Sequence, residues 1–139
     1  MTLLGAGTNV HEALTAADSL VQFGINARVI DLYSAQPLDT ATVLDAARET
    51  GNLIVAEDHW PTGGLGNAVL EALADADSKA RIRRLAVHTR LTPGRPEELL
   101  GRTGIDRSRI ATAARDLPEQ PAQHTDHRRS HRLALALHR

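Results

Sequence analysis

The residues best suited to chemistry in this 139-residue chain lie together in EDHWPTGGLG, residues 57–66. Glu57, Asp58 and His59 are consecutive, and an acid beside an imidazole could transfer protons. Side chains alternate along an extended segment, so Glu57 and His59 could share a face. No serine lies nearby in sequence, and the chain contains no cysteine. The pattern alone therefore favours one interpretation, a polar cluster that caps the loop, and disfavours the other, a catalytic acid–base pair.

The glycines of the same stretch are typical of a close-packed turn. Gly63, Gly64 and Gly66 allow backbone freedom and close approach of another surface. The turn lacks the Lys-Ser/Thr pair of a P-loop, so nothing there would reach a terminal phosphate. Trp60 and Pro61 are apolar groups on a turn that should otherwise be polar. A neighbouring domain or subunit fits this turn better than a small ligand.

A second glycine turn, GAGTNVHEA at residues 5–13, resembles half of a dinucleotide-binding loop. The third glycine of that motif would fall at Val10, and the acid expected about 20 residues later could be Asp31. The match is weak, and a simple tight turn is favoured. An anion could still use the free N–H groups of the helices after Gly7 or Gly66, which leaves a ligand-binding alternative open.

Histidines and arginines gather near the carboxyl terminus. His127 and His131 are four residues apart, a spacing that metal ligands can use on a helix. The surrounding HRRSHR is strongly basic and would repel a cation, so a solvated tail is favoured. Earlier in the chain, the three arginines of RIRR are expected on the solvated face of an edge strand; they are Arg81, Arg83 and Arg84.

Composition limits the class of protein. Apolar residues make up 42% of the chain and aromatic residues 2%, which indicates a globular core of aliphatic side chains. The formal charge of −1 gives no indication of a nucleic-acid or anionic-membrane partner. No apolar run approaches the roughly 18 residues that a bilayer span needs, and no signal peptide is visible. A cytoplasmic protein without a membrane partner is therefore expected.

Strand and helix patterns alternate along residues 1–117. Strands are expected at 2–7, 27–32, 53–57 and 82–87, and the run at 53–57 is apolar enough to be buried on both faces. Asn9 is expected to cap the first helix with Glu12 as its capping-box partner, and Gly24 to end it. Its apolar face is expected to be Val10, Ala13, Leu14, Ala17 and Val21.

Three more helical regions follow. In the first region, Asp39 should cap a helix that ends at Gly51. In the second, a helix is expected at about 66–76. In the third, two short helices are expected, one at PEELLGR and one after Asp106. This alternation predicts an α/β fold of three layers, α/β/α, with a mostly parallel sheet. Residues 118–139 are predicted to be a flexible basic tail rich in His and Arg.

Several of these segments together resemble the C-terminal domain of transketolases. The matching segments are LLGAGTNVHEAL, ARVIDLYSAQPLD, LIVAEDHWPTGGLGNAVLEAL, RLAVHTRLTPGRPEELL and GIDRSRIATAARDL. Their order and spacing follow that family over residues 2–117, and the central block is the most specific. The resemblance implies that residues 1–117 form one such domain. It also implies that one strand of the sheet is antiparallel.

Enzymes of that family use thiamine diphosphate and Mg²⁺ to move a two-carbon ketol unit between sugar phosphates of the pentose phosphate pathway. The resemblance implies that upstream domains hold the cofactor, so no catalytic, cofactor or metal residue is expected in this chain. It is expected to be inactive alone and to contribute to assembly or regulation, with upstream transketolase domains or a separate polypeptide as partner. A homodimer is a further option. The alternative is a stand-alone interaction module or a degenerate fragment.

The same resemblance places the expected contact with another domain or subunit on the glycine loop. The contact residues are expected to be Glu57, Asp58, His59, Trp60, Gly63, Gly64 and Gly66.

Overall fold

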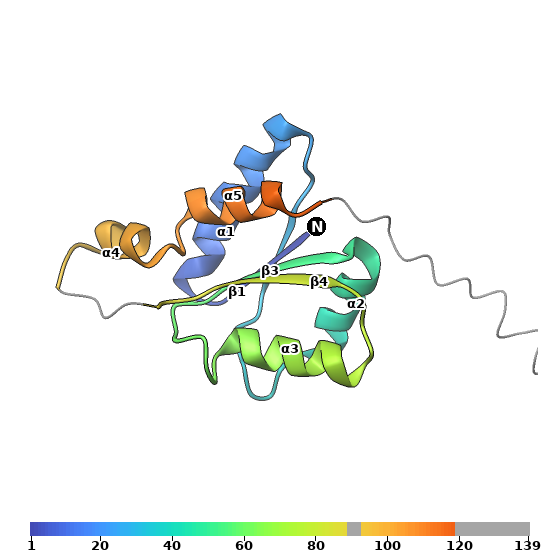
Figure 1. Cartoon of the computed structure of the whole chain (residues 1–139). Coiled ribbons are helices and arrows are strands. Elements are labelled where there is room, and N and C mark those ends of the chain that lie inside the picture. Colours follow the sequence, from blue (N-terminus) through green and yellow to red (C-terminus); the bar gives the residue numbers. More distant parts are fainter. Residues whose placement is uncertain (89–92, 119–139) are drawn as a thin grey trace, which may run out of the picture.

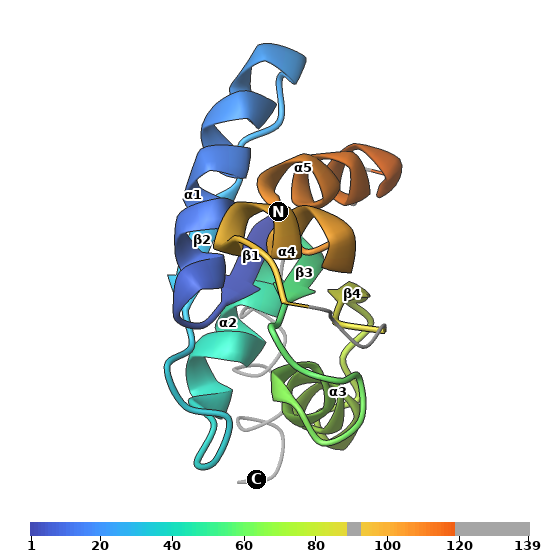
Figure 2. The same cartoon turned by 90° about the vertical axis from the view of Figure 1, so that its left-hand side faces the viewer.

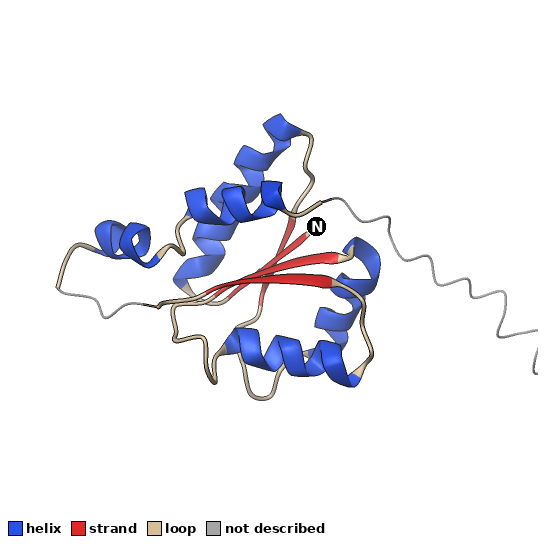
Figure 3. Cartoon of the chain, in the orientation of Figure 1, coloured by secondary structure: helices blue, strands red, loops and turns tan. Residues whose placement is uncertain are grey.

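The computed structural model describes residues 1–88 and 93–118, which form a three-layer α/β/α domain (Figures 1 and 3). The strands are β1 (Thr2–Gly5), β2 (Arg28–Asp31), β3 (Asn52–Ala56) and β4 (Arg81–Leu85). The helices are α1 (Thr8–Leu20), α2 (Thr40–Thr50), α3 (Leu65–Asp75), α4 (Pro96–Thr103) and α5 (Arg107–Asp116), with a 3₁₀ turn, η1, at Val21–Phe23.

The sheet has the strand order β2-β1-β3-β4, and all of its neighbouring strands pair in parallel. The three-layer, mostly parallel expectation is therefore confirmed. The antiparallel strand that the resemblance implies is not present among residues 1–88 and 93–118. The central strand β3 is buried along its whole length, as its apolar sequence predicts.

Two apolar clusters join the sheet to the helices on its faces (Figure 1). One face packs against α2 and α3 through Leu4, Val43, Val55 and Val69. The other packs against α1 and α5 through residues that include Leu3, Leu20, Ile54 and Ile110. Successive residues of a strand thus point to opposite helical layers, which is why β1 and β3 must be apolar on both sides.

The helix ends follow the sequence signals in most places. Asp39 Oδ1 accepts a hydrogen bond from the Thr42 N–H at 3.1 Å, and Asp106 Oδ1 accepts one from the Arg109 N–H at 2.9 Å. Gly24 and Gly51 lie in the left-handed region at φ 72° and 67°, where they end η1 and α2.

The start of α1 differs from the prediction. Gly7, at φ 58°, occupies the cap position, and Asn9 lies inside the helix with 1% of its surface exposed. The predicted apolar face is also displaced, because Leu14 and Val21 are 48% and 63% exposed. The buried face instead consists of Asn9, Glu12, Ala13, Ala16 and Leu20. The prediction failed because Glu12 is buried by a polar partner on α5, which an apolar periodicity cannot reveal.

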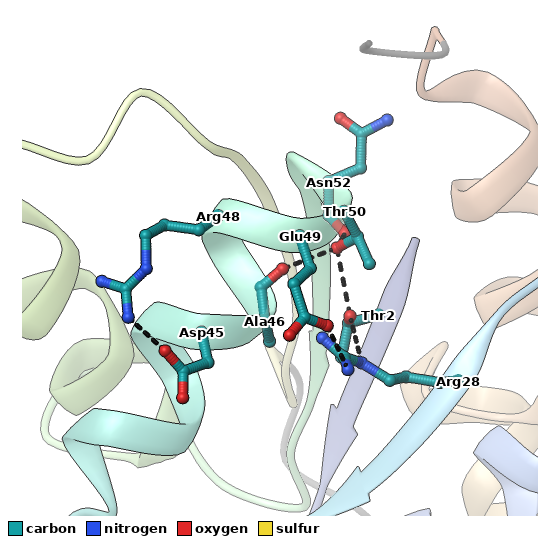
Figure 4. A network of polar contacts seen from close by, with 8 residues as sticks. All are labelled: Thr2, Arg28, Asp45, Ala46, Arg48, Glu49, Thr50 and Asn52. Carbon is teal, nitrogen blue, oxygen red and sulfur yellow. Dashed lines mark hydrogen bonds and ion pairs between the residues drawn. The ribbon is translucent and has the colours of Figure 1, made fainter. Parts of the chain in front are cut away.

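Polar contacts tie the strands together at the amino-terminal edge of the sheet (Figure 4). Thr2, on β1, is fully buried, and its hydroxyl lies 3.1 Å from that of Thr50 and accepts a hydrogen bond from Arg28 Nε at 3.2 Å. Arg28 also pairs with Glu49 at 2.7 Å. At the same edge, Asn52 Nδ2 donates to the carbonyl oxygen of Pro118 at 2.8 Å, which fixes the place where the described chain ends. The predicted flexible tail, apart from Pro118, lies outside the described residues.

Candidate functional site

The glycine loop is organised around the carboxylate of Glu57. Glu57 follows β3 at the carboxyl-terminal edge of the sheet and is only 4% exposed. Its Oε2 accepts a hydrogen bond from the Gly66 N–H at 3.1 Å, in the first turn of α3. A negative charge is favourable at a helix amino terminus, where the N–H groups lack partners within the helix. Glu57 therefore stabilises the start of α3 from inside the domain and presents little surface to a partner.

Two of the predicted loop glycines are needed for this arrangement. A Cβ at Gly64 would collide with Glu57 Oε2, and a Cβ at Gly66 would lie 2.6 Å from both Glu57 Oε1 and Arg84 Nε. Gly63 instead has a backbone φ angle of 77°, which residues with a side chain rarely adopt. Gly64 and Gly66 are therefore closely approached by side chains of the same chain, and a contact of the three glycines with another domain or subunit stays a prediction.

Arg84, on the edge strand β4, is the second charged group at this position. Its Nη2 lies 3.9 Å from Glu57 Oε1 and donates to the carbonyl oxygen of Pro61. The sequence prediction of a solvated arginine was wrong for Arg84, which is partly buried, and correct for Arg81 and Arg83, which are exposed. No pattern in RIRR distinguishes Arg84 from its neighbours, because the distinction arises from Glu57, the buried acid that follows β3.

The surface that the loop offers includes Asp58, His59 and Trp60, all of which are exposed. The backbone beneath them is held by β-type hydrogen bonds, from Glu57 N–H to Leu85 O at 2.9 Å and from Val87 N–H to His59 O at 3.0 Å. His59 Nδ1 lies 2.8 Å from the carbonyl oxygen of Trp60. Trp60 is 51% exposed although its loop is anchored on both sides. Glu57 and His59 do not form the acid–base pair considered above, since Glu57 is engaged below the loop.

Two further features lie at the same carboxyl-terminal edge and were not predicted as contact residues. Tyr33, just after β2, is 90% exposed. Helix α4 projects beyond the strand ends (Figure 1), and Figure 2 shows it in front of the edge. Residues 93–98 and 101–102 on and before α4 are exposed. The only sequence signal for this role was the apolar character of Tyr33 in a loop.

The first glycine turn brings β1 and α1 close together. A Cβ at Gly5 would lie 3.3 Å from the backbone of Asn9, so this glycine lets β1 and α1 approach closely. Asp31 is exposed at the end of β2 and lines a cavity of about 220 Å³ with Tyr33 and Asp39. In a dinucleotide site such an acid would contact the ribose, but Val10 stands where the motif has its third glycine, so the tight turn stays the favoured interpretation.

The amino terminus of α3 does not fit the diphosphate group of thiamine diphosphate. The helix amino terminus after Gly64 already faces the Glu57 carboxylate, so a diphosphate there would meet a like charge. Within residues 1–88 and 93–118, no group of three or more His, Asp or Glu side chains could hold a metal ion. The metal hypothesis for His127 and His131 lies outside the described residues. No described helix combines the length and apolar character required to cross a bilayer.

Comparison with known protein families gives one match over most of the chain. Residues 1–110 match the family model described as "Transketolase, C-terminal domain". The match includes all four strands, the glycine loop and most of the helices.

Individual relatives agree with the family match. The chain is 43% identical over 117 residues to mouse transketolase-like protein 2 and 43% identical over 118 residues to human transketolase. These alignments cover 84% of this chain but 18% and 19% of those proteins, so the chain spans about a fifth of the length of these relatives. A solved structure described as "Split gene transketolase, inactive beta4 tetramer" superposes with a TM-score of 0.77 at 31% identity, covering 88% of this chain and 38% of that one.

Proposed function

Because this chain belongs to the transketolase C-terminal domain family, we propose that it is a docking domain of a transketolase. It contributes to assembly of an enzyme whose thiamine diphosphate, Mg²⁺ and sugar phosphate are bound by other domains. Those domains precede it in a longer chain or form a separate polypeptide. The domain carries no catalytic residue and is inactive alone. Its place would be the cytoplasm and the pentose phosphate pathway, as the family resemblance implies.

The observation that carries this proposal is the contrast within the glycine loop. Glu57 and Arg84 hold the loop from below, while Trp60 remains half-exposed on top of it. An anchored, exposed tryptophan is typical of a protein contact, because rigid aromatic side chains lose little entropy on binding. Asp58 and His59 beside it supply hydrogen-bonding groups for the rim of such a contact.

The wider carboxyl-terminal edge supports the same proposal. Tyr33 adds a second exposed aromatic side chain, and α4 extends past the strands at the same edge (Figure 1). A short helix that packs little against its own domain gains stability when a partner covers it. The carboxyl edge, defined by Tyr33, residues 58–60 and α4, is therefore the proposed docking face.

A division of the enzyme between polypeptides has support in one relative. The solved structure that resembles this chain is described as a split-gene transketolase, in the form of an inactive beta4 tetramer. That description favours a partner polypeptide over a purely stand-alone module. Association between copies of this chain is an additional arrangement that the same test would reveal.

The test mixes this chain with a separately expressed polypeptide carrying the upstream domains of a transketolase. Ketol transfer with thiamine diphosphate and Mg²⁺ is measured together with co-elution on a sizing column. We expect co-elution with the partner and no turnover by this chain alone. Turnover by the chain alone would overturn the assignment as a non-catalytic domain. Failure to co-elute with any tested upstream polypeptide would favour the stand-alone interaction module.

A further inference from the structure

A groove between α2 and α3 lies on the opposite side of the sheet from α1 and α5, separate from the proposed docking face. It has a volume of about 440 Å³. Its lining combines aliphatic groups with two carboxylates and includes Leu38, Leu44, Ala68, Ala72, Glu71 and Asp75. The small alanine side chains leave room for a segment to lie between the two helices.

The charge of the groove comes from α3. Glu71 and Asp75 are exposed and four residues apart, so they lie on the same face of α3, one turn from each other. Neither belongs to an ion pair among the described residues. An apolar floor beneath two carboxylates favours an occupant that carries both leucines and arginines.

The carboxyl-terminal segment of this chain has that composition. Residues 128–139 read RRSHRLALALHR, with four arginines and no aspartate or glutamate. Three of the arginines lie within the five residues that precede LALAL. Arg128 and Arg132 repeat the spacing of Glu71 and Asp75. We propose that residues 128–137 cover the groove between α2 and α3 of their own chain.

The chain is long enough to make this contact. Pro118 is held by Asn52 at the amino-terminal edge of the sheet. Because α3 returns from the carboxyl edge to the start of β4, Asp75 also lies toward the amino-terminal edge. The ten residues from 119 to 128 can span at most about 35 Å. The linker is thus about twice as long as α3, which spans about 16 Å.

The absence of cysteine from the chain permits a direct test of the whole protein. A nitroxide spin label is attached to the variant Ser130→Cys, and the amide signals of ¹⁵N-labelled protein are recorded. A large excess of protein that carries neither the spin label nor ¹⁵N is added, so that broadening by the spin label of another copy becomes negligible. The proposal predicts that Ala68 and Ala72 on α3 lose most of their signal intensity. Ala13 and Ala16, on α1 across the sheet, should remain sharp. Equal intensities at both positions would overturn the proposal.

Charge reversal tests whether the contact is specific. Glu71→Lys with Asp75→Lys should restore the Ala72 signal, and adding Arg128→Glu with Arg132→Glu should broaden it again. The control, Glu97→Lys with Glu98→Lys on α4, reverses two charges away from the groove and should change nothing. Broadening that survives reversal of Glu71 and Asp75 would contradict the role of these carboxylates.

A mixed sample shows whether the segment that covers the groove belongs to the same chain or to a second copy. Here one population is ¹⁵N-labelled without the spin label, and the other carries the spin label on Ser130→Cys without ¹⁵N. The proposal predicts no broadening in this sample. Broadening here, without broadening in the diluted sample, would show that a second copy supplies the segment and would overturn an intramolecular contact.

Discussion

Glu12 on α1 accepts three hydrogen bonds from Arg107, the first residue of α5, although 95 positions separate them in the sequence. The Arg107 backbone N–H lies 2.7 Å from Oε2, and its side-chain nitrogens lie 3.1 and 3.0 Å from Oε2 and Oε1. One buried carboxylate thus caps α5 and pairs with its first side chain. The contact fixes the two helices of one layer against each other.

Removing the charge of Glu12 should weaken the fold. In Glu12→Gln the side chain keeps its shape but loses the charge-assisted hydrogen bonds. We expect the free energy of unfolding to fall by about 1 kcal/mol. The loss is no larger because the Arg107 side chain is exposed, and solvent therefore weakens its attraction to Glu12. Urea unfolding measures the loss. Asp18→Asn, an exposed acid on the same helix, is the control and should change stability by less than about 0.5 kcal/mol. Equal losses in the two variants would contradict the structural role of Glu12.

The same pair should make stability depend on pH. Burial opposes ionisation of Glu12, but the hydrogen bonds and positive charge of Arg107 outweigh it and lower the pKa of this carboxyl below 4.5. A lowered folded-state pKa gives stability that is fully present above about pH 4.5 and is lost as pH falls through the folded value. The stability difference between the natural chain and Glu12→Gln should therefore shrink between pH 5 and about pH 3. A difference independent of pH over that range would show that charge is not its source.

The loop glycines should differ sharply from a helical glycine in their tolerance of alanine. Gly64→Ala places a methyl group against Glu57 Oε2, and we expect a loss of about 1–3 kcal/mol of stability from the forced displacement. Gly101→Ala on α4 is the control, since its Cβ would meet only Asp106 Oδ2 at an ordinary 3.6 Å. That substitution should be neutral or stabilise α4 by up to about 1 kcal/mol. Thermal unfolding of both variants tests the contrast, and a harmless Gly64→Ala would contradict the observed packing.

Neighbouring arginines on β4 should also have unequal effects. Arg84→Ala leaves Glu57 buried without its nearby cation, so we expect a loss of about 2 kcal/mol. Arg83→Ala removes an exposed side chain from the same strand and should cost less than about 0.5 kcal/mol. Denaturant titration of the two variants measures the difference. Similar stabilities would mean that Glu57 does not depend on Arg84.

Local signals in the sequence were sufficient to predict the layers of the fold. The apolar run at residues 53–57 predicts a strand buried on both faces, and Asp39, Asp106, Gly24 and Gly51 mark helix ends through interactions with adjacent residues. These features depend on neighbours within four residues, which a sequence displays directly.

Long-range polar pairs could not be predicted in the same way. Glu12 looked like a capping-box acid because its partner Arg107 lies 95 positions away. Arg84 looked solvated because its partner Glu57 lies far from it in the sequence, just after β3. The glycines of the loop predict close approach by a partner, whereas the group that approaches Gly64 and Gly66 in the structure is Glu57 of the same chain. In the register of β3 with β4, Arg84 pairs with Val55, two residues before Glu57, and no local pattern encodes that register.

Trp60 should contribute to docking more than to folding. In Trp60→Ala the exposed ring is lost while Glu57 and Arg84 still hold the loop, so the free energy of unfolding should change by less than about 1 kcal/mol. Binding to the upstream polypeptide should weaken by at least about tenfold, as expected for an aromatic anchor near the centre of a contact. Phe23→Ala is the matched control, because Phe23 is also about half-exposed, at 49%. Phe23 lies just after the carboxyl-terminal end of α1, away from the docking face, and the Arg115 guanidinium carbon is 4.2 Å from the centroid of its ring. Calorimetric titration compares the two variants. If Trp60→Ala and the natural chain bind the upstream polypeptide with equal affinity, the docking face is not at the carboxyl edge.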